Sequence, residues 1–157
     1  MTPLAPNLVP METGRLARWL AAGREQYVVD RIDAGESRTE AEANAEASYE
    51  STFPGGRPTP SQRIFDVVDR GVVVGVLWIA PRNDAEPTHW WIWDIEIDDE
   101  FRGRGLGRAT MLLAEDQAKV EGAVTLGLNV FGGNSVARAL YASMDYRETA
   151  VQMRKVL

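Results

Sequence analysis

The stretch RGRGLGR, residues 102–108, decides the fold of this chain. It lies between residues 91–98, whose pattern is typical of a strand, and residues 109–120, whose pattern is typical of a helix. A loop at that place presents free backbone N–H groups at a helix N-terminus, beside arginine side chains. Glycines suit such a loop because a phosphate can approach the main chain closely only where no Cβ intervenes. The stretch therefore predicts a pyrophosphate site.

Two common phosphate-binding motifs do not fit this stretch. A Walker A loop needs glycine followed by lysine, but the lysines of the chain, Lys119 and Lys155, do not follow a glycine. A Rossmann site needs the spacing GxGxxG near the start of a βαβ unit, whereas the spacing here is GxGxG in the second half of the chain. The alternative is a solvated turn that binds nothing. The surrounding sequence has to distinguish this turn from a pyrophosphate site.

Composition excludes several kinds of site. With 157 residues, the chain is long enough for one domain that buries its own core. It has no cysteine, which excludes a disulfide framework, a thiolate metal site and a cysteine nucleophile. Its single histidine, His89, does not suffice for a histidine-based zinc site or catalytic triad, and we expect no metal.

Charge and hydropathy bear on partners and location. The net charge of −6 argues against nucleic acid as the main partner. No apolar run has the length of a membrane span, and residues 1–10 lack the features of a signal peptide. We therefore expect a cytoplasmic protein that binds neither nucleic acid nor membrane. Its oligomeric state stays open, a homodimer included.

Apolar periodicity and turn formers divide the chain into alternating elements. Residues 1–7 are expected to fray. Helical spacing begins near Arg15 and is weakened by Gly23, and Thr39 with Glu42 forms a capping box that opens a second helix. The remaining elements are strands over 8–11, 64–68, 72–80, 90–97, 124–131 and 146–156, and helices over 40–52, 106–120 and 134–143. The order β-α-α-β-β-β-α-β-α-β predicts an α/β (α+β) fold with a mixed, mostly antiparallel sheet covered by helices on both faces.

The expected strand over 90–97, WWIWDIEI, carries two carboxylates among apolar residues. Strict alternation places Trp90, Ile92, Asp94 and Glu96 on one face. One carboxylate within such a strand costs free energy, and two need a reason. For Asp94 we favour hydrogen bonds to a neighbouring loop or an arginine partner. The tryptophans, Trp93 among them, are interpreted as core and cleft wall, and the alternative is an aromatic cage for a cationic amine.

With these motifs in place, the chain resembles the GNAT superfamily of acyl-CoA-dependent N-acyltransferases. Arg102, Gly105 and Gly107 fill the CoA motif of that family, [Q/R]xxGx[G/A], without a gap. A second family motif lies downstream as NSVARALY, residues 134–141, and is followed by MDY where the family usually has LGF or LGY. The aspartate of MDY, Asp145, is compatible with the left-handed conformation of the family's glycine.

The resemblance implies a single N-acetyltransferase domain over residues 1–157. Its CoA-binding core would cover residues 64–157, and residues 13–53 would form a two-helix region on the acceptor side. The acidic residues of that region would favour a cationic amine, carried by a small molecule or a protein.

Acetyl-CoA is the co-substrate that the resemblance implies. Backbone groups of the tryptophan strand would pair with the pantetheine arm like an added strand, and the glycine loop would hold the pyrophosphate. An asparagine that can also act simply as a helix cap would bond the CoA arm. The implied residues are Ile95, Glu96, Ile97, Arg102, Gly103, Arg104, Gly105, Leu106, Gly107, Arg108 and Asn134.

The resemblance also implies two catalytic residues. Tyr141 matches the family tyrosine that gives a proton to the departing CoA thiolate, although its spacing also fits a core tyrosine. Glu96 is the candidate base, direct or through water, because an alkyl ammonium with a pKa of about 10 must lose a proton before it attacks a thioester. A glutamate desolvated by tryptophans would have a raised pKa, which suits that task.

Three further residues are placed in the substrate cleft: Asp94, Asn129 and Trp93. Asn129 is polar within an expected strand that is buried on both faces, so it needs partners there. The family's separation of the fourth and fifth strands would supply them in the acceptor cleft.

The sequence thus predicts direct transfer of an acetyl group from acetyl-CoA to a primary amine. The alternative is a non-catalytic acyl-CoA-binding or regulatory module, which would keep the glycine loop but need neither Glu96 nor Tyr141. A structural dimer subunit built around the tryptophan surface is a third interpretation, and it leaves the arginines unexplained.

Overall fold

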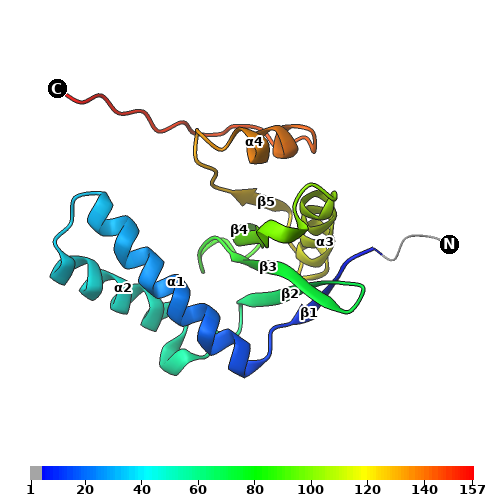
Figure 1. Cartoon of the computed structure of the whole chain (residues 1–157), viewed down its shortest axis with the longest axis horizontal. Coiled ribbons are helices and arrows are strands. Elements are labelled where there is room, and N and C mark those ends of the chain that lie inside the picture. The colour runs from blue at the N-terminus through cyan, green and yellow to red at the C-terminus, as the bar shows by residue number, and fades with distance from the viewer. Residues whose placement is uncertain (1–4) are drawn as a thin grey trace.

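Five strands form one sheet in the computed structural model, which describes residues 5–157 (Figure 1). The strands are β1 (Asn7–Pro10), β2 (Arg63–Asp69), β3 (Val72–Pro81), β4 (His89–Ile97) and β5 (Thr125–Leu128). The helices are α1 (Thr13–Asp33), α2 (Arg38–Thr52), α3 (Leu106–Val120) and α4 (Ser135–Ala142), with short 3-10 turns η1 (Pro54–Gly56) and η2 (Asp99–Phe101). The predicted α/β class is confirmed. Of the segment 1–7 expected to fray, residues 1–4 lie outside the described part, and Asn7 already pairs with Val68.

The sheet has the order β1-β2-β3-β4-β5. Strands β1 to β4 pair antiparallel with their neighbours, and only β5 runs parallel to β4. A parallel neighbour requires a crossover connection, which α3 supplies on one face of the sheet. The prediction of a mixed, mostly antiparallel sheet is therefore confirmed, and it places the start of α3 directly after β4.

Two apolar clusters hold the helices to opposite faces of the sheet. The cluster under α3 contains Phe65, Val67, Val74, Leu77, Ile79, Trp90, Ile92, Leu106, Met111, Ala114 and Ala118. The cluster under α1 and α2 contains Leu16, Leu20, Phe53, Ile64 and Val76, with Trp19, Tyr49 and Trp78 packed against it. Burial of this apolar surface is the main stabilising contribution to the fold. It confirms the predicted cover on both faces.

The α1 and α2 helices differ from the sequence prediction at two places. Helix α1 continues through Gly23 to Asp33. The glycine leaves room for Tyr49 of α2, since a Cβ at position 23 would lie 2.9 Å from the Tyr49 hydroxyl oxygen. The capping box of α2 is Ser37 with Glu40, not Thr39 with Glu42. Both pairs have the required spacing, so the local sequence alone did not distinguish them.

A β-bulge at Trp93 changes the faces of β4. Trp78 pairs with Asp94 and Ile79 pairs with Ile92, which leaves Trp93 as the extra residue of the strand. Beyond the bulge, odd-numbered residues such as Ile95 pack under α3. The strict alternation predicted from the sequence is therefore wrong, since Asp94 and Glu96 do not share the face of Ile92.

The predicted last strand, residues 146–156, does not form. The polypeptide from residue 147 to the C-terminus is extended and exposed, and it belongs to none of the strands in the described part of the chain (Figure 1). An alternating pattern becomes a strand only where a sheet edge is available to it. Here the chain leaves α4 in a direction away from the sheet.

We expect Gly75→Ala to lower the free energy of unfolding by about 3 kcal/mol, because a Cβ at position 75 would collide with the carbonyl oxygen of Glu96 on the neighbouring strand. Urea unfolding followed by circular dichroism measures the change. Gly14→Ala is the matched control, since a Cβ there meets nothing within 4 Å. Equal unfolding midpoints for the two variants would contradict the close approach of β3 and β4.

Candidate functional site

The glycine loop, residues 102–108, has the backbone that the sequence predicts. Gly103 and Gly105 adopt φ values of +73° and +77°, which side-chain-bearing residues rarely adopt. A Cβ at either position would meet nothing within 4 Å, so the surface beside these two glycines is open. Glycine at these positions therefore satisfies a conformational requirement and also leaves the main chain approachable.

The backbone amides of residues 103–108 donate no hydrogen bond to any other group of the described chain. The first amide of α3 with a partner is that of Ala109, which donates to the Gly105 carbonyl oxygen at 3.1 Å. Free amides at the N-terminus of a helix attract anions, because the helix dipole adds to their partial positive charge. The loop can therefore hold a pyrophosphate.

The three arginines of the loop form hydrogen bonds or ion pairs with other groups of the chain. Arg102 donates from Nε to the Ile97 carbonyl oxygen at 2.9 Å and pairs with Asp99 at 2.6 Å. Arg104 donates to the Glu100 carbonyl oxygen at 2.9 Å, and Arg108 donates to the Ser143 hydroxyl. These bonds fix the loop against η2 and against the end of α4. Direct contact of the guanidinium groups with a phosphate stays a prediction.

Strands β4 and β5 part beside this loop. Their pairing covers only residues 89–92 of β4 and 125–128 of β5. Past the bulge at Trp93, residues 94–97 of β4 pair with β3 on one side and have no strand neighbour on the other in the described structure. The separation that the resemblance implied is present, and it leaves the backbone of Ile95, Glu96 and Ile97 at an open strand edge.

Two carboxylates of β4, Asp94 and Glu96, differ in environment. Burial raises the pKa of Asp94 to about 6, and the charge of Glu96 adds to the rise, while hydrogen bonds from the Ile95 amide and the Trp19 indole oppose it. The Glu96 side chain is 59% exposed and lies 4.0 Å from Arg102. The desolvated carboxylate that the sequence analysis sought at Glu96 is therefore found at Asp94.

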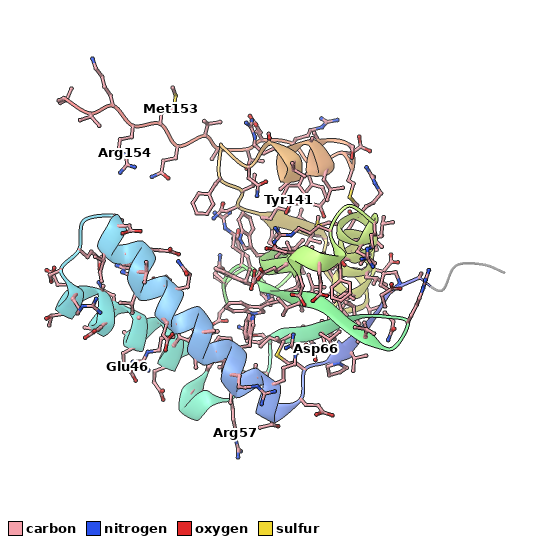
Figure 2. All side chains as sticks on the ribbon, viewed as in Figure 1. Glu46, Arg57, Asp66, Tyr141, Met153 and Arg154 are labelled. Atoms are coloured by element: carbon pink, nitrogen blue, oxygen red, sulfur yellow. The ribbon has the colours of Figure 1, made fainter. Side chains whose placement is uncertain are left out.

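Helix α4 brings Tyr141 close to the glycine loop. Leu140, the residue before it, lies 3.5 Å from the position of a Cβ on Gly107. Tyr141 is half-buried, and Figure 2 shows it between α4 and the sheet. Burial raises the pKa of its phenol, so the hydroxyl keeps its proton at neutral pH.

Asn134 begins α4. Its side-chain oxygen accepts a hydrogen bond from the Ala137 amide at 3.1 Å, which confirms the predicted helix cap. Asp145 ends the turn after α4 with φ +66°, the left-handed conformation that the sequence analysis allowed for it.

Of the residues predicted to bind the acceptor, Trp93 and Asp94 lie on the same face of the sheet, whereas Asn129 lies outside the strands. Trp93 is 46% exposed and stacks on Trp78 with ring centroids 5.9 Å apart, on the same face as Asp94. Asn129 lies beyond the end of β5 and is exposed, so its predicted place in a strand buried on both faces is wrong. Strand β5 ends at Leu128 because β4 no longer pairs with it past Ile92.

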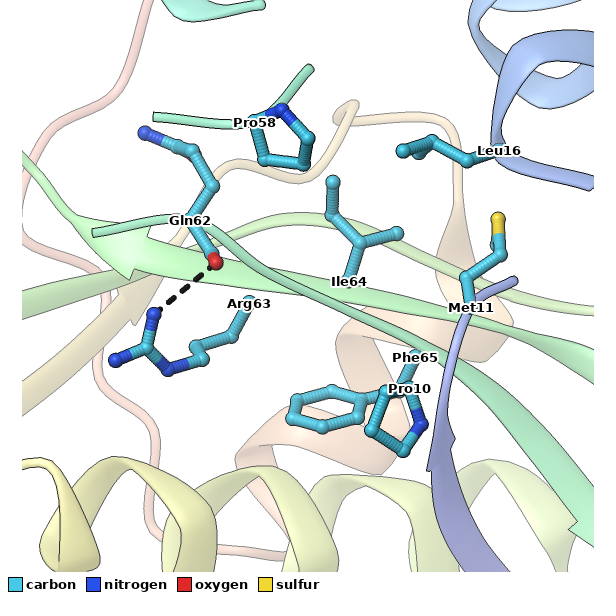
Figure 3. A pocket seen from close by; sticks show the side chains of 8 residues that line it. All are labelled: Pro10, Met11, Leu16, Pro58, Gln62, Arg63, Ile64 and Phe65. Carbon is cyan, nitrogen blue, oxygen red and sulfur yellow. Dashed lines mark hydrogen bonds between the residues drawn. The ribbon is translucent and has the colours of Figure 1, made fainter. Parts of the chain in front are cut away.

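Two hollows lie elsewhere on the surface. One of about 240 Å³ lies beside the β2 strand and is lined by Pro10, Met11, Leu16, Pro58, Gln62, Arg63, Ile64 and Phe65 (Figure 3). The other, of about 170 Å³, lies between α1 and α2. Neither includes a residue of the site predicted from the sequence.

Two features are absent from the part of the chain that the structure describes, a membrane-spanning helix and a cluster of metal-binding side chains. Within residues 5–157, no helix has the length and apolar character needed to cross a membrane. Nor do three or more His, Asp or Glu side chains of that part gather where they could hold a metal ion.

Comparison with known proteins gives one consistent result. Residues 24–146 match the model of the acetyltransferase (GNAT) family. The chain is 29% identical over 152 residues to the uncharacterized N-acetyltransferase YycN of Bacillus subtilis, covering 96% of this chain and 97% of YycN. It is 33% identical over 126 residues to the uncharacterized N-acetyltransferase YdgE of the same organism, covering 76% and 78%. The crystal structure of YycN superposes with a TM-score of 0.80 at 26% identity and covers 97% of this chain and 98% of that one.

Proposed function

Because the chain belongs to the GNAT acetyltransferase family, we propose that it transfers an acetyl group from acetyl-CoA to a primary amine. The observation that carries this proposal is the glycine loop, whose unpartnered amides precede α3. The loop lies against α4, which carries Tyr141, and follows β4, which carries two carboxylates. An anion seat, a proton donor and a proton acceptor are what a direct acetyl transfer requires.

The residues present fit acetyl-CoA. The amides of residues 103–108 would hold its pyrophosphate, and the open edge of residues 95–97 would pair with its pantetheine arm. Acetyl-CoA supplies the thioester that the amine attacks. Asn134, at the start of α4, would bond the CoA arm with the hydrogen-bonding capacity that capping leaves free.

The reaction needs a proton acceptor for the amine. The ammonium of the acceptor loses one proton to the base and the neutral amine forms the new C–N bond. The nitrogen then loses its second proton to solvent as the C–S bond of the thioester breaks. The sequence favours Glu96 as the base, whereas the structure favours Asp94, because burial raises the pKa of Asp94 to about 6, which suits a general base. The Glu96 side chain is exposed and lies 4.0 Å from Arg102. We assign proton removal to Asp94, with Glu96 as the competing candidate.

The departing thiolate needs a proton donor. Tyr141 is suited to this task, because its burial raises the pKa of the phenol and keeps it protonated until the leaving group requires the proton. A proton moves from the phenol to the CoA sulfur, and solvent returns one to the phenolate. The product is an amide and free CoA.

The acceptor is a cationic amine in this proposal. The exposed part of Trp93 offers a ring face to a cation, and Asp94 lies next to it on the same face. Helices α1 and α2 cover that face and together carry seven acidic and five basic side chains, a surplus of two negative charges. A small molecule or a protein could present such an amine.

Release of free CoA from acetyl-CoA, measured against a panel of amines, tests the proposed function. We expect amine-dependent release that is faster for diamines and polyamines than for neutral or acidic amino compounds. Acetyl-CoA binding without release for any amine of the panel would favour the non-catalytic module instead.

We expect Gly105→Ala to weaken acetyl-CoA binding at least about tenfold, which calorimetry measures. The new side chain strains a backbone at φ +77° and projects into the open space beside the loop. Gly122→Ala is the matched control, because Gly122 has φ +86° and equally open surroundings at the other end of α3. Equal loss of affinity in both variants would show that strain alone, and not the loop surface, is responsible.

A further inference from the structure

Tyr49 of α2 carries a half-buried hydroxyl group that has no hydrogen-bond partner within residues 5–157. Of the four tyrosines of the chain, Tyr27 and Tyr146 bond to side chains of the protein, at 2.7 and 3.2 Å. The other hydroxyl without a protein partner is that of Tyr141, to which the proposed reaction gives a ligand. Polar groups that are removed from bulk water are normally paired, so the Tyr49 hydroxyl also requires a partner.

Helix α1 accommodates the Tyr49 hydroxyl by means of Gly23. A Cβ at position 23 would lie 2.9 Å from the hydroxyl oxygen, which is too close, but 4.0 Å from the ring carbon that carries it, which is an ordinary contact. Phenylalanine at position 49 with alanine at position 23 would therefore pack equally well. That pair would also favour the helix, because glycine within a helix is destabilising relative to alanine. The chain thus retains the hydroxyl at the expense of helix stability, as expected of a group with a function outside the fold.

The Tyr49 hydroxyl faces the part of the molecule that contains Asp94. Trp19 and Gly23 are four residues apart and share one face of α1. The indole of Trp19 bonds to Asp94, and the Tyr49 hydroxyl lies against Gly23, about 5.4 Å further along the helix axis. Burial raises the pKa of the Tyr49 phenol, and the negative charge of Asp94 adds to the rise. The two groups are therefore close enough for one small molecule to contact both.

Charges around Tyr49 favour a cation as the partner of its hydroxyl. The ring lines the hollow of about 170 Å³ between α1 and α2, together with Arg24, Glu46 and Glu50. Arg24 and Glu46 form an ion pair with each other, so their charges cancel. Glu50 and Asp94 remain and leave a negative balance, which attracts an ammonium group and repels a carboxylate.

We propose that Tyr49 determines acceptor specificity, and that its hydroxyl oxygen accepts a hydrogen bond from the second ammonium group of a diamine whose first amino group lies at Asp94. This inference rests on the proposed acetyl transfer, and it names the class of acceptor and the residue that selects it. A monoamine of the same length fills the site beside Asp94 but leaves the Tyr49 hydroxyl without a partner. The diamine is preferred for that reason.

The ratio of kcat/KM for diaminobutane to kcat/KM for butylamine tests the role of Tyr49. We expect Tyr49→Phe to lower this ratio at least about tenfold, mainly through a higher KM for the diamine, because a hydrogen bond to a charged group is lost. Tyr27→Phe is the matched control, since its hydroxyl has a partner in Arg31 and the ratio should stay that of the wild type. A wild-type ratio in Tyr49→Phe, or an equal loss for both amines, would overturn the proposal.

Gly23→Ala tests the position of the hydroxyl without removing it. The new Cβ displaces the end of the Tyr49 side chain, so the ratio of diamine to monoamine should fall although alanine favours the helix. The double variant Gly23→Ala with Tyr49→Phe has room for both side chains and should unfold at a temperature no lower than the wild type. Gly23→Ala with the wild-type ratio would contradict a hydroxyl that must lie at this place.

Calorimetry in the presence of free CoA, which has no acetyl group to transfer, measures amine binding by itself. We expect diaminobutane to bind the wild type at least about tenfold more tightly than Tyr49→Phe, with a smaller difference for butylamine. If no amine is acetylated but this difference is found, the proposed reaction is wrong and the role of Tyr49 stands. If amines are acetylated and Tyr49→Phe binds the diamine as the wild type does, the role of Tyr49 is wrong and the reaction stands.

Discussion

Replacing Tyr141 with phenylalanine should lower the rate of CoA release about 100-fold or more, while the affinity for acetyl-CoA stays unchanged. The ring and its packing on α4 are kept, and only the proton that the thiolate needs is removed. Steady-state release of CoA measures the rate, and calorimetry measures the affinity.

Tyr146→Phe is the control for this prediction. Tyr146 lies near Tyr141, with ring centroids 6.1 Å apart, and its hydroxyl donates to Glu115 at 3.2 Å. Its loss would affect stability but should leave the rate close to that of the wild type. Full turnover in Tyr141→Phe, or an equal fall in both variants, would exclude Tyr141 as the proton donor.

The second large effect concerns the pH dependence of the rate. A base acts only when it is deprotonated, so a carboxyl with a pKa of about 6 makes the rate fall as the pH drops below 6. We expect Asp94→Asn to lower the rate about 100-fold and to abolish this acidic limb. Glu96→Gln should keep the limb and shift it to lower pH, because the negative charge of Glu96 contributes to the raised pKa of Asp94. The opposite pair of results would return the role of base to Glu96.

The same residue links stability to pH. The pKa of Asp94 rises from 3.8 to about 6 on folding, so between these values the folded state holds a proton that the unfolded state releases. Stability contributed by the neutral carboxyl is therefore lost as the pH rises through this range. Asp94→Asn should be more stable than the wild type at pH 8, by about 1–3 kcal/mol, and should show no such gain at pH 3.5. Thermal unfolding at the two pH values measures this, and a gain at both would contradict it.

The sequence was sufficient to predict features of the backbone that local chemistry decides. Glycine is favoured at positions 103 and 105 because φ is positive there, and Asn134 could be identified as a cap from its place before a helix. The order of elements followed from apolar periodicity, since each period is set within one element.

Features that depend on the pairing or packing of two segments distant in the sequence could not be predicted from local patterns. The bulge at Trp93 depends on the register of β3 against β4, so alternation alone assigned Asp94 and Glu96 to the wrong face. The environment of Asp94 depends on Trp19, which is distant in the sequence. The end of β5 before Asn129 depends on where β4 parts from it. The expected final strand depends on pairing with a sheet edge, and residues 147–157 pair with none in the described structure.

Amide hydrogen exchange of the glycine loop, with and without saturating acetyl-CoA, tests the central claim most directly. The amides of residues 103–108 have no partner within the described chain, so they should exchange fast in the free protein and slow down when a pyrophosphate accepts their hydrogen bonds. We expect that protection to be concentrated in the loop and to be reduced in Gly105→Ala. Unchanged exchange of these amides at saturating acetyl-CoA would contradict the account.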